Sequence, residues 1–313
     1  MLLDQCFVAG GIGLNVRPQN VEDFSSINRR ITEIAPEIGV LGRPGDLAQI
    51  QLPPELQRMP QLMLYLVNPP LSPPQQGCTL TVEVISKLDQ FHSYQRAGVS
   101  TPRTALVAPE LELTPETWGD RVVIKPMLDS FGRGVAVVDI KQLHEVIKSQ
   151  SAALERLQAA GYLVQQFVDT GPLQEKFRAI IFLGEVILSY RVIYGKARSL
   201  PTYSSIDEAI ADEYFTEGPE LRYQLVKDPE LSAFARQVYQ ANAQCPLQGL
   251  DIQRGADGHL YVLENNAGGN VWKFSDVTSK PFKIFGPKRM IEQYKACDVC
   301  AQALIDATHR LAC

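Results

Sequence analysis

The chain has 313 residues, of which 45% are hydrophobic and 21% are charged, and its formal net charge is -5. This composition excludes a disordered chain, and an acidic balance without a basic cluster argues against nucleic acid as a partner. We therefore expect a globular protein of two or three units that acts on small molecules.

Targeting and redox signals are weak. No apolar run approaches the roughly 20 residues of a membrane-spanning helix, and the first residues, M-L-L-D, lack the basic region of a signal peptide. We therefore expect a cytoplasmic protein without a membrane partner. The six cysteines are too sparse for a disulfide scaffold, and Cys297 and Cys300 form one C-x-x-C pair inside a helical pattern, where a zinc or redox role is the less favoured interpretation.

The first predicted unit covers residues 1–78. Strand-like runs at 5–9 and 61–67 flank a probable helix over 20–34, and the glycines at 10–13 are interpreted as a turn. The proline-rich stretch 68–74 predicts a linker. This unit carries no chemical motif, so we expect it to contribute substrate specificity.

The second predicted unit covers residues 79–168 and contains a lysine followed by a glycine loop. A helix is expected over 88–97, strands over 121–126 and 135–140, and a helix over 143–160. Lys125 ends the first strand before Pro126. The loop places Ser130, Gly132, Arg133 and Gly134 where backbone N–H groups could approach an anion and Arg133 could add charge. A solvent-facing lysine beside an ordinary hairpin turn is the alternative.

The third predicted unit covers residues 169–313. A hairpin over 178–193 turns at Gly184, the segment 199–218 is polar, and helices are expected over 229–243 and 288–310. Strands and helices interleave throughout the chain, which predicts an α/β or α+β class with mixed sheets.

A second hairpin, over 250–266, carries the clearest chemical signal. Asp251 should point away from its buried neighbours Leu250 and Ile252, and the turn at Asp257 and Gly258 returns the chain. Alternation places Val262, Glu264 and Asn266 on one face, so that Glu264 and Asn266 project towards Asp251. Carboxylate and amide oxygens suit Mg²⁺. An exposed polar hairpin face is the alternative.

Taken in order, these residues resemble the motifs of the ATP-grasp enzymes, nearest in pattern to the carboxylate-amine ligases. In that family a lysine precedes a helix that leads to G-[IV]-x-x-P, as Lys87 precedes residues 98–102, G-V-S-T-P. A second lysine stands in V-x-K-P before G-x-G-V, as Lys125 does. The D-x-R strand corresponds to residues 176–178, a later arginine to Arg191, and the metal set G-x-D…E-x-N to residues 249–251 and 264–266. The match runs from about residue 87 to residue 270.

The resemblance implies an ATP-grasp fold in which an N-terminal α/β domain and two further subdomains clasp ATP between mixed sheets. It implies Mg²⁺ at Asp251, Glu264 and Asn266, and contacts to ATP from Lys87, Lys125, the glycine loop and the linker residues Gln165, Gln166, Phe167 and Val168. Two positions depart from the family pattern. Gln166 stands where an acidic residue is common, which leaves backbone carbonyls or Glu175 as alternative partners for adenine, and Lys176 replaces the aspartate of D-x-R.

The resemblance further implies an ATP-dependent ligase that forms an amide bond through an acyl phosphate and releases ADP and phosphate. Its partners would be a small carboxylate and an amine, and a homodimer is one of the assemblies it allows. Arg178 and Arg191 are the candidate catalytic residues, with Arg191 stabilising an oxyanion. Position alone suggests substrate contacts from Gly268, Gly269, Asn270, Lys273 and Ser275. A kinase that stops at phosphoryl transfer and an inactive nucleotide-binding module are the alternatives.

Overall fold

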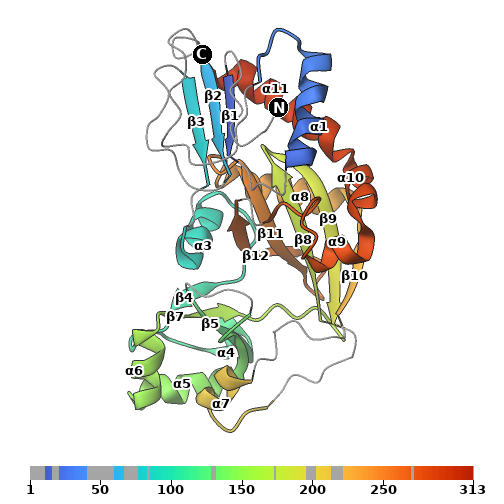
Figure 1. Ribbon diagram of the computed structural model, residues 1–313. Helices are drawn as coiled ribbons and strands as arrows, with labels where there is room; N and C mark the ends of the chain where they lie inside the picture. The colour runs from blue at the N-terminus through green and yellow to red at the C-terminus, as the bar shows by residue number, and fades with distance from the viewer. Residues whose placement is uncertain are drawn as a thin grey trace.

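The computed structural model describes residues 11–15, 21–40, 60–66, 77–82, 85–127, 132–172, 174–194, 202–212, 221–268 and 271–312. Three β-sheets with helices packed on them make up this part of the chain, which confirms the expected α/β class (Figure 1). Figure 1 shows the sheets in a column, with the three-stranded sheet above, the five-stranded sheet in the middle and the four-stranded sheet below.

The three-stranded sheet is parallel and has the order β1-β2-β3, with β1 (Gly11–Asn15), β2 (Gln61–Tyr65) and β3 (Gly77–Thr81). The glycines at 11 and 13 belong to β1, so the expected turn at 10–13 is wrong there. β3 pairs with β2 along its whole length and crosses the proposed boundary after residue 78. The expected strand over 5–9 lies outside the described residues.

The four-stranded sheet is antiparallel and has the order β4-β7-β5-β6. Its strands are β4 (Thr104–Leu106), β5 (Arg121–Pro126), β6 (Ala136–Asp139) and β7 (Tyr162–Gln166), and a short helix, α4 (Pro115–Trp118), precedes β5. The expected helix over 143–160 is two helices, α5 (Ile140–Lys148) and α6 (Ala152–Ala159). Between them Gln150 has a φ of 45°, a left-handed conformation that an α-helix does not continue through.

The polar segment 199–218 also contains ordered structure. Helix α7 (Ile206–Ala211) buries Ile206 and Ala209 in the same apolar core as α5 and α6, and it packs on β6. This helix belongs in space to the four-stranded sheet although it lies within the predicted third unit. The other predicted unit boundaries remain a prediction.

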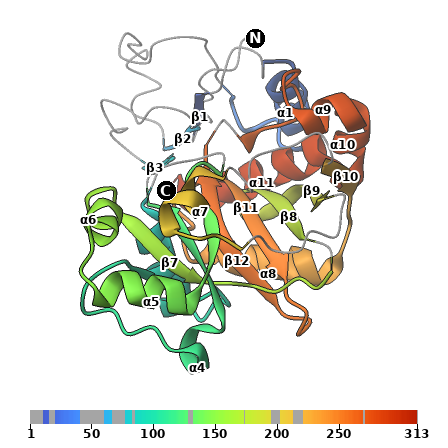
Figure 2. The same ribbon diagram turned by 90° about the horizontal axis from the view of Figure 1, so that it is seen from below.

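The five-stranded sheet is antiparallel and has the order β10-β9-β8-β11-β12. Its strands are β8 (Glu175–Phe182), β9 (Glu185–Tyr194), β10 (Leu221–Leu225), β11 (Leu247–Arg254) and β12 (Leu260–Ala267). Helix α8 (Pro229–Gln240) covers one face, and α9 (Lys280–Phe285), α10 (Pro287–Tyr294) and α11 (Ala296–Leu311) lie on the other side (Figure 2). The expected last helix is divided at Lys295, whose φ is 55°.

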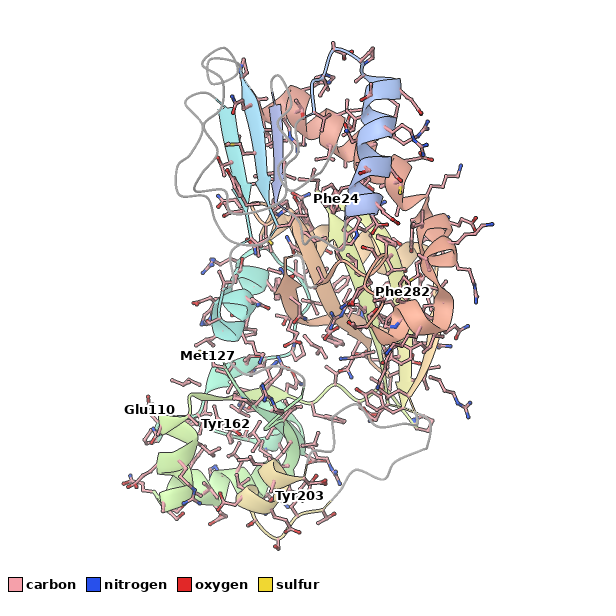
Figure 3. The ribbon with its side chains drawn as sticks, in the orientation of Figure 1. Phe24, Glu110, Met127, Tyr162, Tyr203 and Phe282 are labelled. Carbon is pink, nitrogen blue, oxygen red and sulfur yellow. The ribbon has the colours of Figure 1, made fainter. Side chains whose placement is uncertain are left out.

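One apolar core joins the three-stranded and five-stranded sheets. Helix α1 (Val21–Ile34) packs along α11, and its Phe24 ring lies 4.6 Å from the ring of Trp272. Figure 3 shows Phe24 at the end of α1 that meets the five-stranded sheet. Helix α3 (Lys87–Arg96) connects the five-stranded and four-stranded sheets, because it contacts both β12 and β4. Among the described helices, none is long and apolar enough to cross a membrane.

Candidate functional site

Lys125 lies near the end of β5, where its side chain is buried. Its Nζ donates a hydrogen bond to Oε1 of Gln165 at 2.9 Å. Burial, the largest cause, and the positive charge of Lys87 lower the pKa of Lys125 to about 8, although the negative charges of Glu264 and Asp251 act to raise it. The four charged residues are therefore electrostatic neighbours, although they come from three different parts of the fold.

A polar relay fixes the direction of the Lys125 ammonium group. Thr104 donates its hydroxyl to the carbonyl of Pro102 at 3.0 Å, so it accepts from the Gln165 Nε2 at 2.9 Å. Gln165 must then present its oxygen, and not its amide nitrogen, to Lys125. Both Gln165 and Thr104 are 5% exposed. Gln165 therefore supports Lys125, which differs from the direct nucleotide contact expected for it.

The first turn of α3 holds Lys87 beside the ammonium group of Lys125. Ser86 caps the helix by accepting from the Asp89 N–H at 3.1 Å, and Lys87 donates its Nζ to the carbonyl of Pro126 at 3.1 Å. Gln90 of the same helix makes two hydrogen bonds with β12: its Oε1 accepts from the Asn265 N–H at 2.7 Å, and its Nε2 donates to the Asn265 carbonyl at 3.0 Å. The Gln90 side chain thus pairs with β12 as a neighbouring strand would, and it fixes Lys87 relative to the hairpin of β11 and β12, which we call the acidic hairpin.

Asp251 and Glu264 lie on one face of the acidic hairpin, as expected, but a β-bulge that the sequence did not predict puts them there. Asp251 stands directly opposite Glu264, and the register shifts by one residue between Asp251 and Ile252, where Leu263 is the extra residue. Without this β-bulge Asp251 would face Leu263, and Glu264 would lie on the other side of the sheet. The predicted common face of Val262 and Glu264 is therefore wrong, since Val262 packs with Ile252 in the core beneath α8.

Asp251 is neutralised by two cations from the neighbouring strand β8. Arg178 binds it in two places, through Nε at 2.5 Å and through Nη2 at 2.9 Å, and Lys176 lies 3.4 Å from Oδ2. The carboxylate is only 5% exposed. Burial acts to raise the pKa of Asp251, but Arg178 and Lys176 outweigh it and lower the pKa to about 2. The same carboxylate raises the pKa of Lys176.

A second β-bulge removes Arg191 from this site. The pairing of β8 with β9 shifts between Ile180 and Ile181, and beyond the shift Arg191 faces Phe177. It therefore lies on the sheet face opposite Arg178. There Arg191 contacts Glu175 at 3.2 Å and Gln224 at 2.6 Å. The structure thus does not bring Arg191 or Glu175 to the site, and the expected oxyanion role of Arg191 and the adenine role of Glu175 lack support from the geometry.

The glycine loop connects two paired strands, as expected, since β5 and β6 form a hairpin around it. Gly132 and Gly134 have φ values of 76° and 67°, and the Val135 N–H donates to the Gly132 carbonyl at 3.3 Å. A Cβ atom on Gly134 would lie 2.6 Å from the hydroxyl of Tyr162. Arg133 is exposed on the turn, and Ser130 lies outside the described residues. Glycine is required at position 134 by both conformation and space.

The linker residues after Gln165 occupy β7 and the strand connection that follows. Gln166 is exposed, Phe167 is half-buried and Val168 is buried. The Gln166 N–H donates to the Arg103 carbonyl at 2.8 Å, which ties this end of β7 to the segment that follows α3. A Gln166 side chain that points to solvent is available for a ligand, but its expected role remains a prediction.

The segment after β12 is mainly a packing element. Gly268 approaches the three-stranded sheet, where an added Cβ would lie 2.9 Å from the Leu66 carbonyl. Three residues that follow are buried in the shared core: Val271, Trp272 and Phe274. Lys273 pairs with Asp276 at 3.2 Å, and Ser275 hydrogen-bonds Asp23. These contacts give Lys273 and Ser275 structural partners in place of the expected substrate, while Gly269 and Asn270 lie outside the described residues.

The oxygen ligands expected for Mg²⁺ fit a divalent ion only together with a negatively charged ligand. Asn266 donates its Nδ2 to Glu264 Oε1 at 3.3 Å, so these two side chains meet on one face. Around them four basic side chains outnumber the two carboxylates of Asp251 and Glu264; we call them the basic cluster (Lys87, Lys125, Lys176 and Arg178). Within the described part of the chain no group of three or more His, Cys, Asp or Glu side chains could hold a metal. The negative charges of a polyphosphate would outweigh the excess positive charge of the basic cluster, and the polyphosphate would bring a bound Mg²⁺ ion with it.

The two cysteines of the C-x-x-C pair lie on α11, away from the basic cluster. Burial raises the pKa of Cys297 to about 11 and raises the pKa of Cys300 well above its usual value. Because the thiolate is the reactive and metal-binding form, both side chains behave as apolar core residues at neutral pH.

Comparison with known proteins gives similarity in structure alone. No family model matches the chain, and none of the curated proteins compared with it matches in sequence. The D-cycloserine synthetase DcsG is 14% identical with a TM-score of 0.48, over 94% of this chain and 96% of that chain. The ATP-grasp ligase PsnB, solved with a phosphomimetic variant of a minimal precursor, Mg and ADP, is 19% identical with a TM-score of 0.44, over 72% of this chain and 59% of that chain. D-alanine–D-alanine ligase from Bacillus anthracis is 16% identical with a TM-score of 0.44, over 72% and 67%. The chain thus spans less than two thirds of the length of PsnB.

Proposed function

We propose that this chain is an ATP-dependent carboxylate-amine ligase of the ATP-grasp type. The observation that carries the proposal is the basic cluster itself, in which side chains from α3, β5 and β8 converge on Glu264 and Asp251. Burying a charged lysine costs free energy, and a negatively charged ligand offsets that cost. A nucleotide polyphosphate, which carries several negative charges, supplies that compensation.

Each part of the cluster has a distinct task in this proposal. Lys125 and Lys87 bind phosphate oxygens, and the N–H groups of the loop at Gly132 and Gly134 approach the same ligand. A magnesium ion would be held by Glu264 and Asn266 with the phosphates, and it supplies charge shielding for phosphoryl transfer. Asp251 orients Arg178, which presents its remaining N–H groups to developing negative charge.

The reaction then needs positioning and charge stabilisation more than a protein nucleophile. A substrate carboxylate oxygen attacks the γ-phosphorus, the bond to the ADP oxygen breaks, and an acyl phosphate forms. The amine nitrogen next attacks the acyl carbon and loses a proton, and inorganic phosphate leaves. The partners are therefore a small carboxylate and an amine, or a peptide that carries these groups.

Release of ADP and phosphate from Mg-ATP tests the proposal. Purified protein is screened with pooled amino acids and small carboxylates, with and without an amine acceptor. We expect phosphate release that requires both an acid and an amine, and its loss by at least a hundredfold in Lys125→Met because buried positive charge at the phosphates is removed. Arg236→Met is the matched control, since it removes an exposed ion pair with Glu185 at 2.8 Å on the far side of the sheet. Transfer of phosphate to one substrate, without free phosphate, would instead identify a kinase, and nucleotide binding without turnover in any pool would favour a binding module.

A further inference from the structure

The clearest departure from the sequence-based expectation is a lysine that contacts Asp251, a carboxylate that the sequence predicts as a metal ligand. Lys176 lies on the same face of β8 as Arg178, two residues away, and its Nζ is 3.4 Å from Asp251 Oδ2. Arg178 contacts both oxygens of the same carboxylate. Asp251 therefore has one negative charge and two positive partners before any ligand binds.

A divalent cation cannot replace these partners easily. Asp251 is 5% exposed, and β8 and β11 are paired along this stretch, so Arg178 and Lys176 are fixed by the same sheet that holds the carboxylate. An ion placed at Asp251 would lie within reach of two cations in a poorly hydrated position, where like charges repel strongly. Glu264 differs, because the contact described for its carboxylate is the neutral amide of Asn266 at 3.3 Å.

Lys176 also remains accessible to a ligand. Its side chain is 32% exposed, in contrast to 18% for Arg178 and 5% for Asp251, and an ammonium group has three donors. It can thus keep one contact with Asp251 while it donates to a phosphate oxygen. A compact point charge of this kind provides the electrostatic effect of a bound cation at a fixed place.

We propose that Lys176 is a fixed cation that takes the place of a divalent ion at Asp251, so that the nucleotide complex holds its metal at Glu264 and none at Asp251. The inference rests on the proposed nucleotide site. It assigns Lys176 to phosphate binding and predicts a ratio of one divalent ion per bound nucleotide.

Equilibrium dialysis with Mn²⁺ and ADP counts both ligands directly. The wild-type chain should bind one Mn²⁺ for each bound ADP, and Lys176→Met should bind two, because Oδ2 of Asp251 then keeps only one of its two donors and the local positive charge is lower. Lys176→Arg should keep one, and Arg236→Met should match the wild type. Glu264→Gln should lose this ion while ADP still binds through Lys87, Lys125 and Lys176.

Each outcome separates the inference from the function that it rests on. Two ions in the wild-type complex, or one ion in a folded Lys176→Met variant, would overturn the inference alone. Circular dichroism checks the fold of that variant, and Lys176→Gln serves in its place if it does not fold. A wild-type chain that binds no ADP would overturn the proposed function and the inference with it.

Discussion

At the scale of single residues, Lys125 links protonation to ligand binding. Its pKa of about 8 lies below the 10.5 of an exposed lysine, so the unfolded chain binds more protons between these values and the lysine makes the protein more stable as pH rises through this window. The positive charge needed for phosphate is lost over the same window. ATP affinity should therefore fall as pH rises above about 8, by up to tenfold per unit. Calorimetric titrations at several pH values measure this slope.

A variant with a permanent charge isolates the contribution of Lys125. Lys125→Arg stays protonated over the whole range, so its affinity should change little with pH. Thr104→Val removes the acceptor of the Gln165 amide and should shift the midpoint of the wild-type curve, because Gln165 can then turn away from Lys125. If the ATP affinity of Lys125→Arg fell with pH as steeply as that of the wild type, another group would cause the pH dependence.

The sequence predicts the residue types of the site better than their placement. Lys87, Lys125, Asp251 and Glu264 meet as the motifs suggest. Arg191 does not, because a plain two-residue hairpin would place it opposite Lys176, and the extra residue near Ile181 turns it to the other face. No sequence pattern in these strands indicates where the two β-bulges lie. Gln90 and Thr104 were missed for a related reason, since their partners are distant in sequence.

At the scale of elements, Gln90 controls where α3 presents Lys87. Gln90→Leu would leave the buried N–H and carbonyl of Asn265 without their partners, which costs roughly 1–3 kcal/mol for each group. We expect a lower free energy of unfolding in urea and weaker ATP binding, because Lys87 loses its fixed distance to Glu264. Gln95→Leu changes an exposed glutamine of the same helix and should alter neither quantity. Equal effects of the two variants would show that the losses come from any change in α3 and not from the hydrogen bonds between Gln90 and Asn265.

The glycine loop offers a second test at this scale. Gly134→Ala combines a left-handed backbone, which costs about 1–2 kcal/mol for a residue with a Cβ, with a contact of 2.6 Å to the Tyr162 hydroxyl. We expect weaker ATP binding, since the loop must move. Gly258→Ala has a similar φ of 84° but open space around it, so it should cost stability without affecting the ligand. Tyr162→Phe should restore part of the loss in Gly134→Ala, as measured by titration with ATP.

Helix boundaries also show what a periodic pattern leaves open. Residues 143–160 and 288–310 each have continuous helical spacing, yet each contains a left-handed residue, Gln150 and Lys295, at which one helix ends and the next begins. Neither is glycine, so sequence gives little sign of the break. The short strands β3 and β4 were missed because their pairing partners, and not their composition, define them.

At the scale of the whole molecule, the three-stranded and five-stranded sheets share one core and should unfold together. Trp272 is 2% exposed, and it contacts Phe24 and donates its indole N–H to Asp23 at 2.8 Å. Trp272→Ala should cost roughly 3–5 kcal/mol of unfolding free energy, in one transition seen by all probes. Trp272→Phe should keep most of it. Two separate transitions in the wild type would contradict a shared core.

Isothermal titration of the wild-type chain with Mg-ATP measures whether the basic cluster binds a nucleotide polyphosphate, on which the proposed function depends. We expect one nucleotide per chain, with binding that Lys125→Met abolishes and Arg236→Met preserves. Absence of binding in the folded wild-type protein, or equal binding by Lys125→Met, would contradict this expectation.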